Sequence, residues 1–402
     1  MGAPKHSAFR NLAIGVAGFL SLVIANGIGR FAFTPMLPLM QRDGAIDIAS
    51  GAWLAAANYA GYLAGAVAAT YMRAGARSLI RCSLPPIAIL TVAMGFTEGM
   101  RLWLLLRFLT GVLAALVLVG TSAWCLGELA KTGRPLLAGI VYAGVGAGIA
   151  IAGALCLAFS GTPIPAALLW QYLGYIAGAL TMAVWLLIWF SGAQTTSSAA
   201  MATANAPTNT ASEHGLIICY GCLGFGYILP ATFIPALGRM VIDDPALFGW
   251  AWPIFGVTAA VSTILTSMLL NKTRRLVVLS HSYFVMALGT GLPAISPSMP
   301  ALLVSAVCVG GTFMVITMAG LQEARSRAGS HPTRLIGLMT AAFAIGQIAG
   351  PTFSALLAYS ALLDEKTSIR AGLLVASTIL VLCGIWLVRA SQSRPSAEGA
   401  KT

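Results

Sequence analysis

Two arginine residues lie in stretches of this sequence that are otherwise apolar enough to cross a lipid bilayer. Arg30 falls within the apolar run 12–40, and Arg107 falls within the run 102–126. A charged side chain at the centre of a bilayer costs about 3 kcal/mol or more, so such a residue usually faces a cavity, a partner group or a substrate. Since successive runs cross in opposite directions, we expect both arginines in the outer half of the membrane.

The neighbours of these arginines extend their polar character along one face of each helix. Asn26, Arg30 and Thr34 repeat every four residues, and Arg107 shares a narrow polar face with Thr110. Residues four apart in a helix lie on the same side of it. We therefore predict that both faces point into a cavity.

Acidic residues are absent from the middle of every predicted span. Glu98, Glu128 and Glu323 fall at span ends, and the others fall in loops and tails. Two arginines without an internal counter-ion predict that the counter-ion arrives with the substrate, as a carboxylate or another anion that the guanidinium fork suits. A second role stays open, in which each arginine bonds backbone carbonyls freed near Pro35 and Pro38.

The composition identifies an all-α integral membrane protein. Of 402 residues, 58% are hydrophobic and 8% are charged, against about 25% charged residues in ordinary soluble domains. A membrane helix needs about 20 apolar residues. Runs of that length predict twelve transmembrane helices near 12–40, 51–72, 78–97, 102–126, 135–160, 166–190, 215–240, 247–270, 276–294, 299–322, 333–360 and 368–388.

An internal repeat divides these spans into two sets of six. Gly27–Arg42 reads GIGRFAFTPMLPLMQR and Gly224–Arg239 reads GFGYILPATFIPALGR, each in the first span of its half. Parallel repeats of this kind are known in secondary transporters. We expect pseudo-symmetric six-helix bundles at 1–190 and 214–402, joined by an Ala/Ser/Thr-rich cytoplasmic linker at 191–213.

The repeat and the helical spacing add further candidate contacts. Tyr227 occupies the position of Arg30 when the two stretches are aligned, and Asn58 and Tyr62 share one face of the second span. We predict substrate contacts for these three residues and for Gln347 in the eleventh span, with simple packing as the alternative.

The net charge of +12 reflects membrane topology rather than binding to nucleic acid. Most of the 23 Lys and Arg residues fall in loops and tails on the side of Lys5 and Arg10. This bias follows the positive-inside rule and predicts that both termini are cytoplasmic. The sequence contains no pattern for a metal, a cofactor or a catalytic triad, so we expect a cofactor-free, non-enzymatic and monomeric protein of the bacterial cytoplasmic membrane.

Several motifs resemble those of the major facilitator superfamily. Ala68–Arg77 (AATYMRAGAR) is similar to a degraded form of its G-x-x-x-D-R-x-G-R-R signature, with Met72 in place of Asp. Arg107–Gly111 matches the R-x-x-x-G of proton-coupled members, and Gly346–Pro351 looks like a Gly-rich packing segment. More narrowly, Ala25–Pro35 together with Asn58–Tyr62 resembles the YbfB/YjiJ-type branch.

The resemblance implies a mechanism and a set of gating residues. In this superfamily, basic cytoplasmic loops latch the outward-open state by pairing with acidic helix ends, and the arginine of R-x-x-x-G serves proton coupling. The matching positions are Arg73, Arg77, Lys272 and Arg274 in the loops and Glu128 and Glu323 at the helix ends. Met72 replaces the Asp of the family signature in the loop between the second and third spans, and so weakens the latch expected there.

The prediction is a secondary active transporter that moves a small organic, acidic solute by alternating access, coupled to protons. Efflux of drugs or metabolites by proton antiport is one alternative. A non-transporting membrane sensor on the same scaffold is another. The identity of the solute and the direction of transport do not follow from the sequence.

Overall fold

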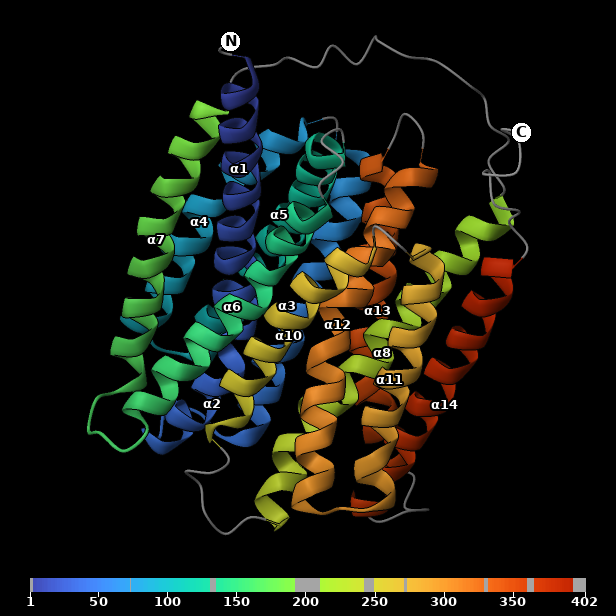
Figure 1. The fold of residues 1–402 in the computed structure, drawn as a ribbon. Coiled ribbons are helices and arrows are strands. Elements are labelled where there is room, and N and C mark those ends of the chain that lie inside the picture. The colour runs from blue at the N-terminus through green and yellow to red at the C-terminus, as the bar shows by residue number, and fades with distance from the viewer. Residues whose placement is uncertain are drawn as a thin grey trace.

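The computed structural model describes residues 3–72, 74–130, 135–191, 210–241, 249–270, 273–328, 332–359 and 365–392. Within these ranges the regular structure is entirely helical and forms one elongated bundle (Figure 1). The first six spans comprise α1 (Ala3–Leu22), η1 (Val23–Phe31), α2 (Phe33–Arg42), α3 (Ile48–Tyr71), α4 (Ala76–Phe96), α5 (Met100–Ala130), α6 (Pro135–Phe159) and α7 (Ala166–Phe190). The remaining spans are α8 (Thr210–Val241), α10 (Ala251–Leu269), α11 (Arg275–Ile295), α12 (Met299–Arg327), α13 (Pro332–Tyr359) and α14 (Glu365–Gln392).

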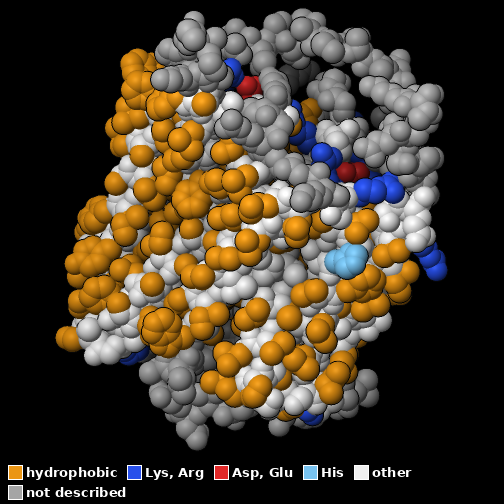
Figure 2. All heavy atoms as spheres, viewed as in Figure 1, with side chains coloured by type: hydrophobic (Ala, Val, Ile, Leu, Met, Phe, Trp, Pro, Cys, Tyr) orange, Lys and Arg blue, Asp and Glu red, His pale blue; other side chains and the backbone are white. Residues whose placement is uncertain are grey.

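The helices have the length and composition of membrane spans. Eleven spans in the described residues are long and apolar enough to cross a bilayer, with α1, η1 and α2 counted as one. The 24-residue helix α3 is not among these eleven and lies at the second predicted span, 51–72, which brings the total to twelve. Hydrophobic side chains cover the flanks of the bundle, while charged side chains on the visible face gather mostly toward the end where α1 begins, the upper end (Figure 2). The predicted membrane protein is confirmed.

The first span is not a uniform α-helix. Between α1 and α2, residues Val23–Phe31 form a π-helix in which every residue is buried. Glycines at 27 and 29 weaken the preference for regular α-helix, and Pro35 lacks the N–H that would continue the hydrogen-bond ladder. π-Helical turns are often found at functional sites. The break places the carbonyls around Gly29 and Arg30 where side chains of other helices can reach them.

Close backbone contacts between spans explain part of the high glycine content. A Cβ atom at Gly27 would lie 2.5 Å from the Cα of Gly148, so η1 and α6 touch backbone to backbone. In the repeat position, a Cβ at Gly224 of α8 would collide with the carbonyl oxygen of Phe343 in α13. Small residues permit such approaches in membrane bundles. The two matched glycines therefore make matched contacts.

Contacts also join spans from the two halves of the sequence. Helix α6 packs along α10, and α3 packs against α13. Most of the linker predicted at 191–213 lies outside the described residues, while Ser191 ends α7 and Thr210 already begins α8. The division into two bundles at 1–190 and 214–402 therefore stays a prediction.

Candidate functional site

Arg30 lies in the π-helical segment and is buried in the middle of the bundle. Only 4% of its surface is exposed. Its Nη2 donates a hydrogen bond to Oε1 of Gln347, which lies on α13 in the other half of the sequence. Its guanidinium carbon lies 3.7 Å from the ring centre of Tyr62 and 5.1 Å from that of Phe31. The first predicted cavity residue is thus surrounded by aromatic faces and one amide.

Arg107 reaches the same segment from α5 but bonds to backbone. Its two terminal nitrogens donate to the carbonyl oxygens of Gly29 and Arg30, at 2.9 Å and 3.1 Å. In a π-helical ladder the carbonyl of Arg30 would pair with residue 35, which is a proline without an N–H. Arg107 therefore fills the role that remained open in the sequence, because it binds carbonyls freed near Pro35.

Asn58 supports Arg107 from the second span. Its Nδ2 donates to the backbone carbonyl of Arg107 at 2.9 Å, and its side chain is fully buried. The backbone of Asn58 also lies against Gly111 of α5, where a Cβ would meet the carbonyl of Asn58. Asn58 thus holds Arg107, which in turn binds the segment that carries Arg30, and Asn58 itself does not line the cavity.

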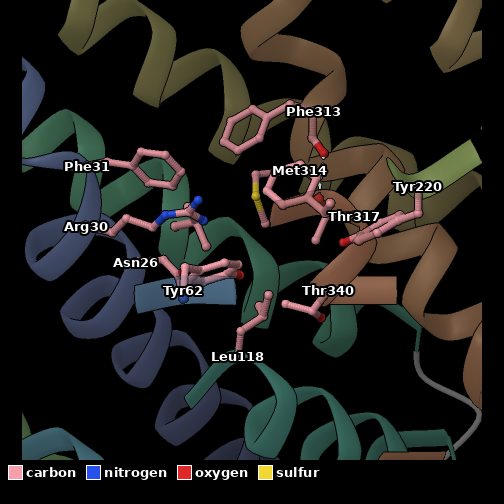
Figure 3. Close-up of a pocket in the computed structure, with 12 residues that line it drawn as sticks. Asn26, Arg30, Phe31, Tyr62, Leu118, Tyr220, Phe313, Met314, Thr317 and Thr340 are labelled. Carbon is pink, nitrogen blue, oxygen red and sulfur yellow. Dashed lines mark hydrogen bonds between the residues drawn. The ribbon is translucent and has the colours of Figure 1, made fainter. Parts of the chain in front are cut away.

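A small cavity opens beside Arg30 (Figure 3). Its volume of about 20 Å³ is enough for a water molecule but not for a metabolite. Spans from both halves contribute to its wall, which comprises Asn26, Arg30, Phe31, Tyr62, Leu118, Val145, Tyr220, Phe313, Met314, Thr317, Thr340 and Phe343. Arg30 provides the only formal charge among these twelve lining residues. The structure therefore represents a closed state around a singly charged site.

Three buried nitrogen donors at this site have no acceptor among the described residues. They are Nε of Arg30, Nδ2 of Asn26 and Nε2 of Gln347. Asn26 and Gln347 are 3% and 0% exposed, so bulk solvent does not reach these atoms. A buried donor left without a partner costs about 1–3 kcal/mol, and more when it is charged. The site therefore has a surplus of donors that an acceptor-rich ligand would satisfy.

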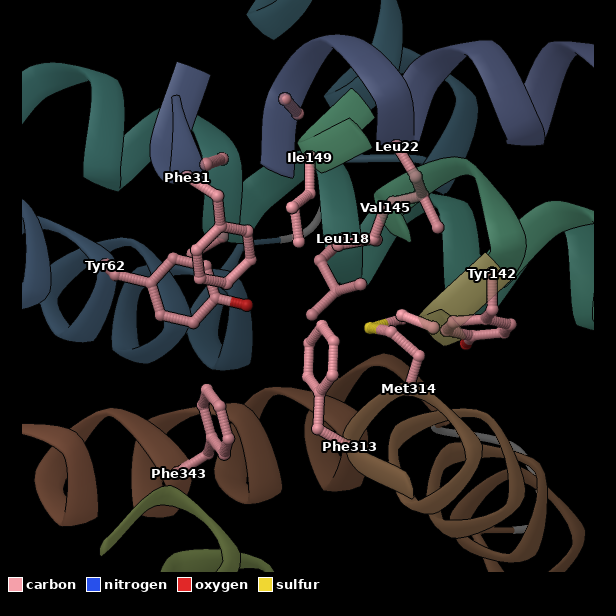
Figure 4. Close-up of a cluster of buried hydrophobic side chains, with 14 of the residues drawn as sticks. Leu22, Phe31, Tyr62, Leu118, Tyr142, Val145, Ile149, Phe313, Met314 and Phe343 are labelled. Atoms are coloured by element: carbon pink, nitrogen blue, oxygen red, sulfur yellow. The ribbon is translucent and has the colours of Figure 1, made fainter. Parts of the chain in front are cut away.

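Aromatic side chains from both halves, among them Phe31, Tyr62, Phe313 and Phe343, gather in one buried cluster (Figure 4). Phe313 of α12 stacks on Tyr227 of α8, with ring centres 4.9 Å apart, and on Phe255 of α10 at 5.3 Å. Phe31 meets both Tyr227 and Phe313 edge-on. Tyr227, the repeat counterpart of Arg30, thus belongs to an aromatic cluster rather than to the cavity wall.

The sequence-predicted site residues separate into three groups. Asn26, Arg30 and Tyr62 line the cavity, and Gln347 contacts it through Arg30. Arg107, Asn58 and Tyr227 lie behind the wall, and Thr34 is half-buried on α2 outside the lining. Sequence reasoning missed Phe313, Phe343, Tyr220, Met314, Thr317 and Thr340. No polar periodicity distinguishes these residues, and only the contact between halves reveals them.

The predicted gating residues that the structure describes lie at the upper end of the bundle. Glu128 pairs with Arg10 at 2.6 Å. Glu323 pairs with Arg327 at 2.7 Å and with Arg275 at 3.5 Å, and both of these partners lie in its own half.

The basic loop residues make other contacts or fall outside the structure. Arg77 stacks over Trp124, 5.2 Å from the ring centre, and Arg274 precedes α11 as its N-cap residue. Arg73 and Lys272 lie outside the described residues.

A contact that the sequence did not predict joins the halves at this end. Nη1 of Arg325 on α12 donates to the carbonyl oxygen of Ala123 on α5 at 2.7 Å. Gly127, one turn further along α5, gives the guanidinium room, because a Cβ there would collide with it. Each acidic helix end thus has an ion-pair partner in its own half, and the charge of Glu128 also acts on Arg325, which connects the two halves.

Comparison with known proteins completes this description. A family model described as the uncharacterised MFS-type transporter YbfB matches residues 22–388. The chain belongs to this family. It is therefore a multi-pass membrane protein of the major facilitator superfamily, and the resemblance to the YbfB-type branch is confirmed. A search of curated proteins finds no match.

Proposed function

We propose that this MFS-type transporter moves a small organic anion across the bacterial cytoplasmic membrane by alternating access, as a monomer and without a cofactor. The observation that carries the proposal is the donor surplus at Arg30. Nε of Arg30, Nδ2 of Asn26 and Nε2 of Gln347 are buried beside one cavity without an acceptor. A carboxylate supplies four lone-pair sites for the unpartnered donors and one negative charge for the unpaired guanidinium of Arg30.

Cationic drug efflux fits the site less well. The cavity wall contains one arginine and no carboxylate among its twelve lining residues. A cation would have to enter next to a buried positive charge, and like charges in a medium of low dielectric repel strongly. The charge of the site therefore favours an acidic solute over the antiport of cations.

Alternating access is supported by the matched contacts of the two halves. The contact of Gly27 with Gly148 has its counterpart in the contact of Gly224 with Phe343, as expected for two related six-helix bundles. The positive-inside bias supports cytoplasmic termini, so the upper end faces the cytoplasm. In this arrangement the Arg325–Ala123 contact closes the cytoplasmic side, and rocking of the bundles breaks it.

Proton coupling is the driving force that we expect. Neither Asp nor Glu lines the cavity among the described residues, so no carboxylate there is available to carry the proton. The simplest carrier is the acid itself, which crosses together with its proton.

Flux into proteoliposomes tests the transport proposal. Organic acids and permanent cations are offered separately to wild type, Arg30→Gln and the charge-retaining Arg30→Lys. Charged hydrogen bonds contribute about 1.5–3 kcal/mol each, so Arg30→Gln should weaken acid uptake about tenfold or more. Uptake of permanent cations, or wild-type acid uptake by Arg30→Gln, would contradict the anion site.

Cross-linking tests alternating access separately. A Cβ at Gly337 of α13 would lie 2.7 Å from Thr70 of α3, at the upper end of the bundle. In a cysteine-free background, a disulfide between Thr70→Cys and Gly337→Cys should stop uptake, and reduction should restore it. Unchanged uptake in the cross-linked protein would contradict the rocking mechanism.

A further inference from the structure

We propose that the substrate is a monocarboxylate with a flat aromatic ring, bound with its carboxylate on Arg30 and its ring in the aromatic cluster. This inference rests on the proposed anion transport and specifies the class of anion. It follows from three features: the number of available charges, the walls of the cavity and the closed state of the site.

The first feature limits the charge of the substrate. Arg107 is the other buried cation near the site, and its terminal nitrogens already bind the carbonyls of Gly29 and Arg30. Nε of Arg107 also has no acceptor among the described residues, but Arg107 does not line the cavity, so Arg30 is the one guanidinium in the cavity wall with an unused donor. One carboxylate neutralises it, whereas a second carboxylate would be buried without a cation, which is unfavourable.

The second feature concerns the body of the substrate. Phe31, Tyr62, Phe313, Phe343 and Tyr220 line the cavity together with Met314. Aromatic faces and a polarisable thioether favour flat aromatic ligands over saturated ones of equal size. Arg30 itself stacks on Tyr62, so the charged group and the ring faces share one location.

The third feature is the way in which the cavity is closed. Only about 20 Å³ is free. In the second half of the sequence Phe313 stacks on Tyr227, and Phe31 of the first half meets both rings edge-on. A ligand must therefore replace ring contacts such as Phe313 with Tyr227. A flat ring replaces a stacking partner with another of the same geometry, whereas a saturated ring cannot. The walls thus select for the shape of the substrate, and Arg30 selects for its charge.

Three acids separate these effects: benzoate, cyclohexanecarboxylate and terephthalate. Benzoate and cyclohexanecarboxylate have the same charge but differ in flatness, and terephthalate is flat but carries two carboxylates. The apparent Kd of each acid for the purified full-length protein is measured by thermal stabilisation, at an ionic strength kept constant with sodium chloride. We expect benzoate to bind about two- to tenfold more tightly than cyclohexanecarboxylate and at least tenfold more tightly than terephthalate.

Substitutions test which residues cause the preference for benzoate over cyclohexanecarboxylate. Phe313→Leu should bring benzoate and cyclohexanecarboxylate to equal affinity while both still bind, and Phe343→Leu serves as a second test in case the first variant does not fold. Arg30→Gln should abolish stabilisation by both acids.

The outcomes distinguish the two proposals. Equal or tighter binding of cyclohexanecarboxylate by wild type overturns the aromatic substrate but leaves the anion site standing. Tighter binding of terephthalate than of benzoate overturns the single-charge argument. If none of the acids stabilises the wild-type protein, the anion site itself is wrong, and both proposals fail.

Discussion

The two buried arginines should respond in different ways to the same substitution, because only one of them supports the backbone. Both are almost fully buried, with 3% exposure for Arg107 and 4% for Arg30. Replacing either by Met removes one buried charge. It also removes the ring contacts of the guanidinium, which are four for Arg30, with Tyr62 the nearest, and one for Arg107, with Phe33. The charge term cancels when the two variants are compared, and the Met side chain itself makes favourable contacts with the rings, so the comparison mainly reports the hydrogen-bond acceptors that each arginine leaves behind.

The difference can be estimated from the bonds that are lost. Arg107→Met leaves two backbone carbonyls without their donor, those of Gly29 and Arg30. Arg30→Met leaves one acceptor, the amide oxygen of Gln347, which can rotate. One additional unsatisfied buried group costs about 1–3 kcal/mol. Arg107→Met should therefore be less stable than Arg30→Met by about that amount.

Thermal unfolding in one detergent, at one pH and without ligand, measures this difference. Arg107→Met should unfold several degrees below Arg30→Met. Arg30→Met should unfold close to the wild type or above it, because the standing cost of an unpaired charge is gone. If Arg30→Met proves as unstable as Arg107→Met or more so, then Arg30 is a structural residue, and the assignment of separate roles is wrong.

Three further predictions concern packing, the outer loops and the gate. Gly148→Ala should lower stability by about 1–3 kcal/mol, because its Cβ would lie 2.6 Å from the Cα of Gly27. The control Gly178→Ala, whose Cβ meets nothing within 4 Å, should leave stability unchanged. Equal unfolding temperatures of the two variants would contradict the backbone contact. Burial alone would raise the pKa of Asp43, but hydrogen bonds from Ala166 N–H and Arg42 lower it below its usual 3.8. The ionised Asp43 carboxylate therefore stabilises the fold above pH 3.8, and this stabilisation is lost as the pH falls through the lowered pKa. Asp43→Ala should cost about 1 kcal/mol at neutral pH and nothing below the lowered pKa. Unfolding measured across pH checks this, and a loss of stability that persists in acid would contradict it. In a cysteine-free background that carries Ala123→Cys, adding Arg325→Gln should open the upper end of the bundle and speed maleimide labelling of the cysteine. Adding the control Arg327→Gln should not. Equal labelling rates in the two variants would show that the Ala123 contact is not a gate.

The sequence predicted the scaffold well because the membrane imposes strong rules on it. Apolar runs, loop charges and the glycine repeat located most spans to within a few residues of the helices, for example 166–190 for α7 and 276–294 for α11, whereas α1 begins at Ala3, well before the predicted start at residue 12. Backbone groups in lipid must bond within their own helix, which leaves few alternatives. The π-helical segment at Val23–Phe31 was not predictable in the same way, since two of its carbonyls bind Arg107, a side chain from another span.

The candidate site was predictable only where it is polar. Polar side chains stand out in apolar spans because an ionisable or amide group is costly there unless it has a partner. Arg30, Asn26 and Gln347 are such residues. Phe313 and Phe343 do not stand out, since aromatic residues are common in any membrane helix. Their role arises from contacts between spans far apart in the sequence, which periodicity within one helix cannot reveal. For the same reason, the sequence offered carbonyl binding near Pro35 as an open role for both arginines but could not assign it to Arg107 alone.

The position of a bound acid is the most direct test of the central claim. A structure of the protein determined in the presence of benzoate should place the carboxylate oxygens about 2.7–2.9 Å from nitrogens of Arg30, with Asn26 Nδ2 or Gln347 Nε2 as a further donor. The ring should lie against Phe313 or Phe343. A benzoate with its carboxylate directed away from Arg30, or bound outside this cavity, would contradict the account.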